Sequence, residues 1–164
     1  MFESKRLSFR NLTDKDADDF FEIFNSEKVS KFIPSMNFKQ TKNYIKKSMQ
    51  FPFLFAVILK ETGKMIGIIG LKEKQPNIAT LSYVFNDKFW HKGYASESVN
   101  IVVDKAFGSW NFNEIKADCQ FNNLASNKLL KKFNFQFEYS NKENISHLTN
   151  EKIKFNFYSL KKPN

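Results

Sequence analysis

The residues with the clearest chemical potential lie in one short segment, Phe89-Trp90-His91-Lys92-Gly93-Tyr94-Ala95-Ser96-Glu97. It follows a run typical of a β-strand, Ile78 to Phe85, and opens a run with the periodicity of an amphipathic helix, Ala95 to about Trp110. A turn that leads into a helix presents unpaired backbone N–H groups at the positive end of the helix dipole. Gly93 allows close backbone approach because it has no Cβ atom. The segment therefore predicts a site for a pyrophosphate group, with Lys92 adding positive charge.

The same segment resembles the acetyl-CoA pyrophosphate loop of the GNAT acetyltransferases, commonly written Q/R-x-x-G-x-G/A. Within that family it is similar to the W-G-K-G-Y-A variant of the branch of ribosomal-protein N-acetyltransferases. An ordinary strand-to-helix turn with one glycine is the alternative interpretation. The resemblance implies that acetyl-CoA contacts the turn and the helix start through Trp90, His91, Lys92, Gly93, Tyr94, Ala95 and Ser96.

Three further segments resemble the same branch. The run from Asn123 to Phe135 is similar to N-x-x-S-x-x-x-L-x-K-x-G-F, with Asn134 at the glycine position. Asn is the next best residue for a left-handed helix end, so we expect a positive φ at Asn134. The start of the chain, with Arg6 and Arg10, resembles the R-L-x-L-R-x-L opening strand, and the closing Tyr158-Ser159-Leu160 also resembles the branch. Structural ion pairs are the favoured role for both arginines, ahead of substrate contact.

Hydrophobic periodicity predicts alternating strands and helices along the whole chain. Asn111 is expected to end the central helix in a left-handed conformation, and Gly63 to form a hairpin turn. The acidic residues Asp18, Asp19 and Glu22 are interpreted as a solvated helix face, with attraction of a cationic acceptor as the alternative. Expected strands are 7–9, 53–59, 65–71, 78–85, 114–119, 135–139 and 153–157, and expected helices are 17–24, 41–49, 95–110 and 123–133, with a polar loop at 140–150.

This order resembles the GNAT fold, an α/β (α+β) architecture in one domain covering residues 1–164. The resemblance implies a mixed central sheet of about seven strands flanked by about four helices. In that fold the fourth and fifth strands, here Ile78–Phe85 and Glu114–Cys119, splay apart to hold the pantetheine arm.

The resemblance also implies a mechanism in which the acceptor amine attacks acetyl-CoA directly. Backbone groups near Tyr83, Val84 and Phe85 would pair with the arm and polarise the thioester carbonyl. Asn123 would hold the arm through its amide, or cap the helix, or do both. Ser126 would protonate the leaving thiolate, with a plain helix-face serine as the alternative. Cys119 is expected to be a buried strand residue rather than a nucleophile.

The general base is the least defined part of the site. Many members of the branch carry a glutamate in an A-E-L-G-Y strand context, where this chain has Thr80. Some GNAT enzymes carry a tyrosine four residues before the helix-ending glycine, where this chain has Leu130. Glu143 is the leading candidate because some relatives carry a base in that loop. The alternatives are a water relay, Glu138 and Asp118, whereas His91 and His147 are poor candidates.

Composition narrows the class of protein. With 164 residues and 41% hydrophobic content the chain can bury a core, and it contains no apolar run of membrane-spanning length. One cysteine excludes an internal disulfide and favours a cytoplasmic protein. The formal net charge of +9 fits RNA or ribosome binding, but the lysines are scattered, so a compositional bias is the favoured interpretation.

The leading hypothesis is therefore an N-acetyltransferase that uses acetyl-CoA as co-substrate and needs no metal. The acceptor would be a protein N-terminus, including a ribosomal one, or a small amine, and the enzyme a monomer or homodimer away from membranes. The alternative is a catalytically weak module of the same fold that binds acyl-CoA as a sensor or binds a partner protein. A basic nucleic-acid-binding protein is the third hypothesis.

Overall fold

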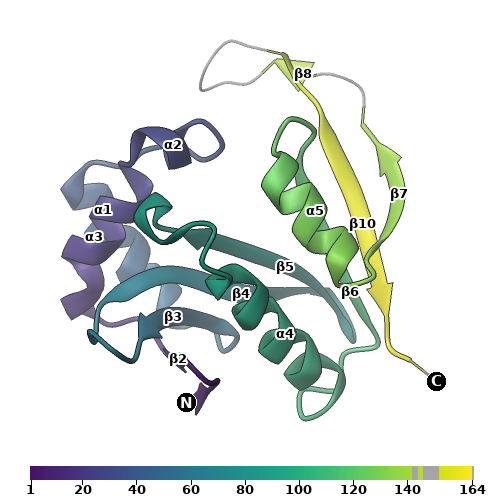
Figure 1. The fold of residues 1–164 in the computed structure, drawn as a ribbon, viewed down its shortest axis with the longest axis horizontal. Helices are drawn as coiled ribbons and strands as arrows, with labels where there is room; N and C mark the ends of the chain where they lie inside the picture. Colours follow the sequence, from purple (N-terminus) through teal and green to yellow (C-terminus); the bar gives the residue numbers. More distant parts are fainter. Residues whose placement is uncertain (142–143, 146–151, 164) are drawn as a thin grey trace. The chain divides into compact units, whose positions relative to one another are not determined.

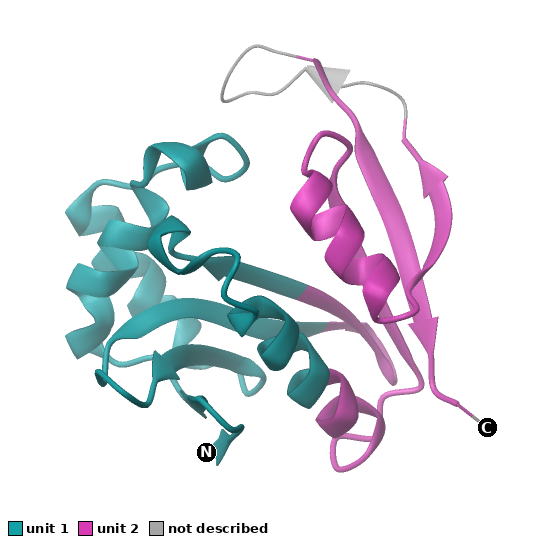
Figure 2. Cartoon of the chain, viewed as in Figure 1, with its two compact units in different colours: residues 1–72, 82–102 teal, residues 73–81, 103–164 magenta. Residues whose placement is uncertain are grey.

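The computed structural model describes residues 1–141, 144–145 and 152–163, with strands and helices alternating along the chain (Figure 1). The chain divides into two compact units (Figure 2). Unit 1 comprises Met1–Lys72 and Ser82–Val102, and unit 2 comprises Glu73–Leu81 and Val103–Asn164. Strand β5 (Ile78–Phe85) and helix α4 (Tyr94–Phe107) each contribute residues to both units.

The sheet of unit 1 is built from neighbouring antiparallel strands at the start of the chain. They are β1 (Phe2–Glu3), β2 (Leu7–Arg10), β3 (Leu54–Leu59) and β4 (Met65–Gln75), in that order, and β4 neighbours β5. The predicted hairpin between β3 and β4 is confirmed: Gly63 has a φ of 69° and its N–H donates to the carbonyl of Leu59 at 2.8 Å. This positive φ suits glycine because a Cβ atom would be strained there.

Helices cover this sheet because their apolar residues recur at helical spacing. The helices are η1 (Asp14–Asp16), α1 (Ala17–Phe24), α2 (Glu27–Ser30) and α3 (Phe38–Ser48). Figure 1 shows α1 and α3 behind the strands of unit 1 and the start of α4 in front of them. One core cluster joins α1 and α3 to β3 and β4 through Phe20, Ile23, Phe24, Ile45, Ala56, Ile58, Met65 and Ile68.

Unit 2 contains the first part of β5 followed by β6 (Glu114–Gln120), β10 (Phe155–Lys161) and β7 (Gln136–Ser140) in sheet order. Helix α5 (Leu124–Lys132) connects β6 to β7 and contacts β6. A separate two-stranded ribbon pairs β8 (Asn144–Ile145) with β9 (Lys152–Ile153).

The ladder between β5 and β6 is short. These parallel strands pair from Ile78 with Glu114 to Leu81 with Ala117, and within the described residues the ladder ends there. On its other side β6 pairs with β10 along its full length. The residues of β5 after Leu81 therefore form no described ladder with β6.

The predicted order of the main strands and helices is confirmed, with differences in detail. Helix α2 and strand β8 were not predicted, β8 lying in the expected polar loop at 140–150, and the last strand spans Phe155–Lys161 rather than 153–157. Strand β1 was not predicted, and α3 begins at Phe38 rather than Thr41 because Asn37 and Gln40 form a capping box. Helix α4 ends at Phe107 rather than Trp110. The predicted positive φ angles are confirmed at Asn111 (56°) and Asn134 (61°).

Candidate active site

The segment between β5 and α4 has the backbone of an anion-binding turn. A short helix, η2 (Asp87–Phe89), leads to Trp90, which is extended, and then His91 and Gly93 take φ angles of 61° and 80°. A Cβ atom placed on Gly93 would meet one side-chain atom within 4 Å, Nη2 of Arg6 at 3.4 Å. The outer face of the turn is therefore open enough for a ligand to approach the backbone closely. His91 stands where the W-G-K-G-Y-A pattern has a glycine, which matches its left-handed conformation.

The helix after the turn supplies backbone donors. Its first bond runs from the N–H of Glu97 to the carbonyl of Gly93 at 3.0 Å, so the N–H groups of Tyr94 and Ala95 have no acceptor within the helix. Together with the helix dipole and the exposed Lys92, they favour a bound anion.

The turn is attached to the end of β5. The indole N–H of Trp90 donates to the carbonyl of Phe85 at 2.8 Å, and the N–H of buried Asn86 donates to the carbonyl of Ile66 at 2.9 Å. The side-chain oxygen of Asn86 accepts from the N–H of Lys88 at 3.0 Å and so caps η2. One continuous stretch of unit 1 therefore contains Tyr83, Val84, Phe85 and the predicted loop residues. Within it, the carbonyl of Phe85 accepts the hydrogen bond from the indole of Trp90.

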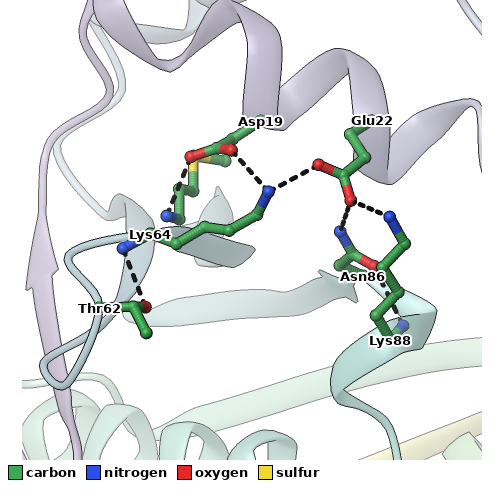
Figure 3. A network of polar contacts seen from close by, with 7 residues as sticks. Asp19, Glu22, Thr62, Lys64, Asn86 and Lys88 are labelled. Atoms are coloured by element: carbon green, nitrogen blue, oxygen red, sulfur yellow. Dashed lines mark hydrogen bonds and ion pairs between the residues drawn. The ribbon is translucent and has the colours of Figure 1, made fainter.

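An ionic network fixes the same turn to α1 (Figure 3). Glu22 accepts hydrogen bonds from Nδ2 of Asn86 at 3.0 Å, Nζ of Lys88 at 2.8 Å and Nζ of Lys64 at 2.7 Å. These donors lower the pKa of Glu22 from 4.5 to about 2, the bond from Lys64 contributing most. Asp19 accepts from the N–H of Met65 at 3.1 Å and pairs with Lys64 at 3.2 Å. The interpretation of the acidic residues as a solvated helix face was wrong for Asp19 and Glu22, because both form ion pairs with lysines outside α1. Asp18 is exposed, as that interpretation expected.

The structural ion pairs predicted for the two arginines are confirmed. Nε of Arg6 lies 2.7 Å from Oε2 of Glu97, and Nη2 of Arg10 lies 2.7 Å from Oδ1 of the buried Asp16.

Asn123 and Ser126 lie together at the start of α5, in unit 2. Oδ1 of Asn123 accepts from the N–H of Ser126 at 3.1 Å, which confirms Asn123 as the N-cap. Among the described residues, neither the amide N–H₂ of Asn123 nor the hydroxyl of the half-buried Ser126 has a hydrogen-bond partner. Both groups are therefore available to a ligand.

A buried asparagine below them was not predicted to matter. Nδ2 of Asn127 donates to the carbonyls of Asn123 at 2.8 Å and Gln120 at 3.1 Å, and its Oδ1 accepts from Asn156 at 2.7 Å and Tyr158 at 2.6 Å. Asn127 therefore connects α5 to β6 and β10. The spacing of residues in the sequence does not predict this role of Asn127, because Asn156 and Tyr158 come from a distant strand. The sequence indicates it only through a polar residue between the apolar Leu124 and Leu130.

Cys119 lies on β6 and is buried. Burial, assisted by the charge of Asp118, raises the pKa of the thiol to about 11. A protonated, buried thiol is a poor nucleophile, which agrees with the prediction that Cys119 is not catalytic.

The three carboxylates considered as the general base, Asp118, Glu138 and Glu143, lie in different parts of the chain. Thr80 pairs with Lys116, and since side chains alternate along a strand, Asp118 lies on the same face of the sheet as Thr80. Asp118 is exposed on β6, but partial desolvation raises the pKa of its carboxyl group above the ordinary value, opposed by the charge of Lys74. Glu138 is exposed on β7, while Glu143 and His147 lie outside the described residues.

Two further kinds of feature are absent from the described part of the chain. It contains no group of three or more His, Cys, Asp or Glu side chains that could hold a metal ion. Nor does any helix there combine the length and apolar character needed to cross a bilayer.

Comparison with known proteins supplies the family. A family model described as "Acetyltransferase (GNAT) domain" matches residues 6–136. The chain is 30% identical over 145 residues to "Uncharacterized N-acetyltransferase p20" of Bacillus licheniformis, covering 82% of each protein. A crystal structure of a GNAT-family acetyltransferase from Bacillus anthracis superposes with a TM-score of 0.89 at 26% identity, covering 98% of this chain and 97% of that one. The ribosomal-protein-S5-alanine acetyltransferase of Vibrio fischeri shares the fold, with a TM-score of 0.83 at 20% identity and coverage of 98% and 96%.

The fold, the turn and these similarities together show that the chain belongs to the GNAT acetyltransferase family. It is accordingly an acetyltransferase.

Proposed function

We propose that the protein transfers the acetyl group of acetyl-CoA to a primary amine by direct attack in a ternary complex. The observation that carries this proposal is the turn before α4, where His91 and Gly93 adopt left-handed conformations and the N–H groups of Tyr94 and Ala95 have no acceptor within the helix. Trp90–Ser96 would bind the pyrophosphate there. No protein nucleophile is required, which is consistent with the protonated thiol of Cys119.

The pantetheine arm and the thioester would be held by groups on either side of the turn. In this proposal the backbone of Tyr83, Val84 and Phe85 pairs with the arm, and one N–H polarises the thioester carbonyl. Asn123 contributes its amide N–H₂, which its capping role leaves unused. The β5–β6 ladder that ends at Leu81 supports this arrangement, since it does not extend to these three residues of β5.

Proton transfer would involve two residues of the C-terminal half. Ser126, whose hydroxyl has no partner within the described residues, would protonate the leaving thiolate. Glu143 remains the base proposed from the sequence. Asp118 is the described alternative, because a raised pKa brings a carboxyl group closer to the range of an effective base.

The acceptor class follows from the chemistry of amines. An α-amino group, with a pKa of about 7.7–8.0, is neutral more often at physiological pH than a lysine amine at about 10.4. The Vibrio fischeri enzyme of the same fold is named for a ribosomal protein with an alanine acceptor. We therefore propose a protein N-terminus as the first acceptor to test, then small amines. We further propose that residues 1–164 act as one domain, in the cytoplasm, as a monomer or homodimer.

A catalytically weak module that binds acyl-CoA is the second candidate. One specific observation favours it: Thr80 stands where related chains carry a strand carboxylate, and Leu130 is buried where others carry a tyrosine. Binding of acetyl-CoA without transfer to any amine would support this candidate.

The first experiment is calorimetric titration of acetyl-CoA into the wild type, Gly93→Glu and Gly63→Glu. Both glycines have a positive φ and little around them, so the two substitutions impose similar backbone strain. We expect micromolar binding by the wild type and Gly63→Glu, and loss of binding in Gly93→Glu, which places a carboxylate in the phosphate site. No binding by a folded wild type would refute the proposal.

The second experiment measures turnover with a panel of N-terminal peptides and small amines. We expect Ser126→Ala to lower kcat by about 100-fold or more, the lower range for loss of a general acid, with little change in KM. Normal turnover by this variant would remove Ser126 from the mechanism.

A further inference from the structure

We propose that Arg6 is a positioning residue for acetyl-CoA, which fixes the turn before α4 and neutralises the carboxylate of Glu97 beside it. This inference rests on the proposed function of the turn as the pyrophosphate site. Arg6 lies more than 80 positions before the turn in the sequence. The proposed role requires no direct contact between Arg6 and the substrate.

Three contacts join Arg6 to the turn and the helix. Its Nε donates to Oε2 of Glu97 at 2.7 Å, its backbone N–H donates to Oε1 of Glu97 at 2.8 Å, and its Nη1 donates to the carbonyl of Lys92 at 3.0 Å. The hydroxyl of Ser4 completes the set by donating to Oε1 of Glu97 at 2.7 Å. Arg6 therefore holds both the residue before Gly93 and the first turn of α4.

The guanidinium also lies under the rest of the turn. It is 4.5 Å from the ring centroid of Tyr94, and its Nη2 is the atom that a Cβ on Gly93 would meet at 3.4 Å. Contacts with Glu97, Lys92 and Tyr94 at once require a planar group with several donors. A lysine ammonium in this position could serve one or two of these contacts but not all of them.

Arg6 also settles an electrostatic conflict. Glu97 lies in the first turn of α4, where a carboxylate stabilises the helix but repels a bound anion. Burial alone would raise the pKa of Glu97, but the hydrogen bonds from the Arg6 backbone, Ser4 and the Arg6 side chain outweigh it, so the pKa lies below its ordinary value of 4.5. Glu97 is therefore ionised at neutral pH, and the charge of Arg6 cancels the repulsion that it would exert on a pyrophosphate.

Arg10 provides a matched control on the same stretch of chain. It forms an equally close arginine–carboxylate pair, with Asp16 at 2.7 and 2.8 Å, on β2 and η1 rather than on the turn. Replacing each arginine by lysine keeps the charge and removes the fork. A loss of stability without a specific effect on the turn should therefore appear in both variants.

The experiment measures the Kd for acetyl-CoA and the melting temperature of the wild type, Arg6→Lys, Arg10→Lys, Arg6→Met and the double variant Arg6→Met/Glu97→Gln. We expect Arg6→Lys to weaken binding several-fold and Arg6→Met by about tenfold or more, while Arg10→Lys binds as the wild type does. The double variant should recover part of the affinity lost in Arg6→Met, because the unbalanced carboxylate is gone.

The outcomes separate this inference from the proposed function. Absence of acetyl-CoA binding by the wild type would refute the proposed function itself. Wild-type affinity in both Arg6 variants, or an equal loss in Arg10→Lys, would overturn the positioning role while leaving the pyrophosphate site intact. An Arg6→Met defect that Glu97→Gln does not relieve would overturn the neutralising role.

Discussion

The carboxylate of Glu22 shows how single residues stabilise the site from a distance. It joins α1 to the start of β4 and to the turn after β5 through two lysines and an asparagine. The two lysines are partly exposed, so surface salt bridges of small value would be the default expectation, but Asn86 is buried. Three donors on one carboxylate make a network, and the lowered pKa reports its strength.

We predict that Glu22→Gln lowers the free energy of unfolding by about 1–2 kcal/mol at pH 7. The shift from 4.5 to about 2 would correspond to roughly 3 kcal/mol if fully realised, and the 31% exposure of the side chain reduces it. Because the folded-state pKa is depressed, this stabilisation is complete above pH 4.5 and is lost as the pH falls towards 2.

Urea unfolding of the wild type and Glu22→Gln at pH 7, 5, 4 and 3 tests this prediction. Glu61→Gln, at an exposed hairpin position, is the control and should change stability little at any pH. A difference between wild type and Glu22→Gln that stays constant down to pH 3 would contradict the assignment.

At the scale of elements, the left-handed positions that follow helices were predictable, whereas one helix end was not: α4 ends at Phe107, before the predicted end at Trp110. Asn111 and Asn134 were expected in left-handed conformations because each follows the last apolar position of a helical pattern, and both have positive φ angles. His91 was not expected there, because its conformation depends on the path of the turn between β5 and α4 rather than on a local signal.

The end of α5 gives a test at this scale. We predict that Asn134→Ala lowers the free energy of unfolding by about 1 kcal/mol, since alanine tolerates the φ of 61° less well than asparagine. Asn134→Gly should instead raise it by about 0.5 kcal/mol, because glycine has no Cβ to strain. Chemical denaturation of both variants beside Asn122→Ala, an exposed position without a positive φ, measures the effect. Equal losses in the alanine and glycine variants would show that the asparagine side chain, rather than φ, matters.

At the scale of the whole molecule, strand β5 and helix α4 each pass from one compact unit to the other. If one unit unfolds, the other unit loses the continuation of β5 and of α4. This continuity favours cooperative unfolding of the chain as one domain.

We predict that two single-tryptophan variants unfold at the same urea concentration. Trp110→Phe leaves Trp90 as a reporter of unit 1, and Trp90→Phe leaves Trp110 as a reporter of unit 2. Fluorescence and circular dichroism should give coincident transitions within each variant. Acetyl-CoA at about 100 times its Kd should stabilise both by roughly 2.7 kcal/mol. Separate fluorescence and circular dichroism transitions in either variant would show that the units unfold independently.

The sequence predicted the order of the main strands and helices, because periodicity and turn residues are local signals. The assignment of Trp90–Ser96 to the pyrophosphate site remains a prediction. The sequence could not predict the partners of Glu22, Glu97 or Asn127, since each side chain meets residues brought close only by the sheet. The general base could not be identified from the sequence either, because whether a carboxylate can act as a base depends on its surroundings in the fold. Asp118 illustrates the point: it is exposed on β6, yet partial desolvation by its surroundings raises the pKa of its carboxyl group.

The buried thiol of Cys119 has a practical consequence. With a pKa of about 11, the thiol is almost entirely protonated at neutral pH, and burial keeps alkylating reagents away while unit 2 is folded. Its rate of modification by iodoacetamide or a disulfide reagent therefore measures how often the strands around it open, and no label has to be engineered. The same rate measured with acetyl-CoA would show whether its binding reduces local opening of β6.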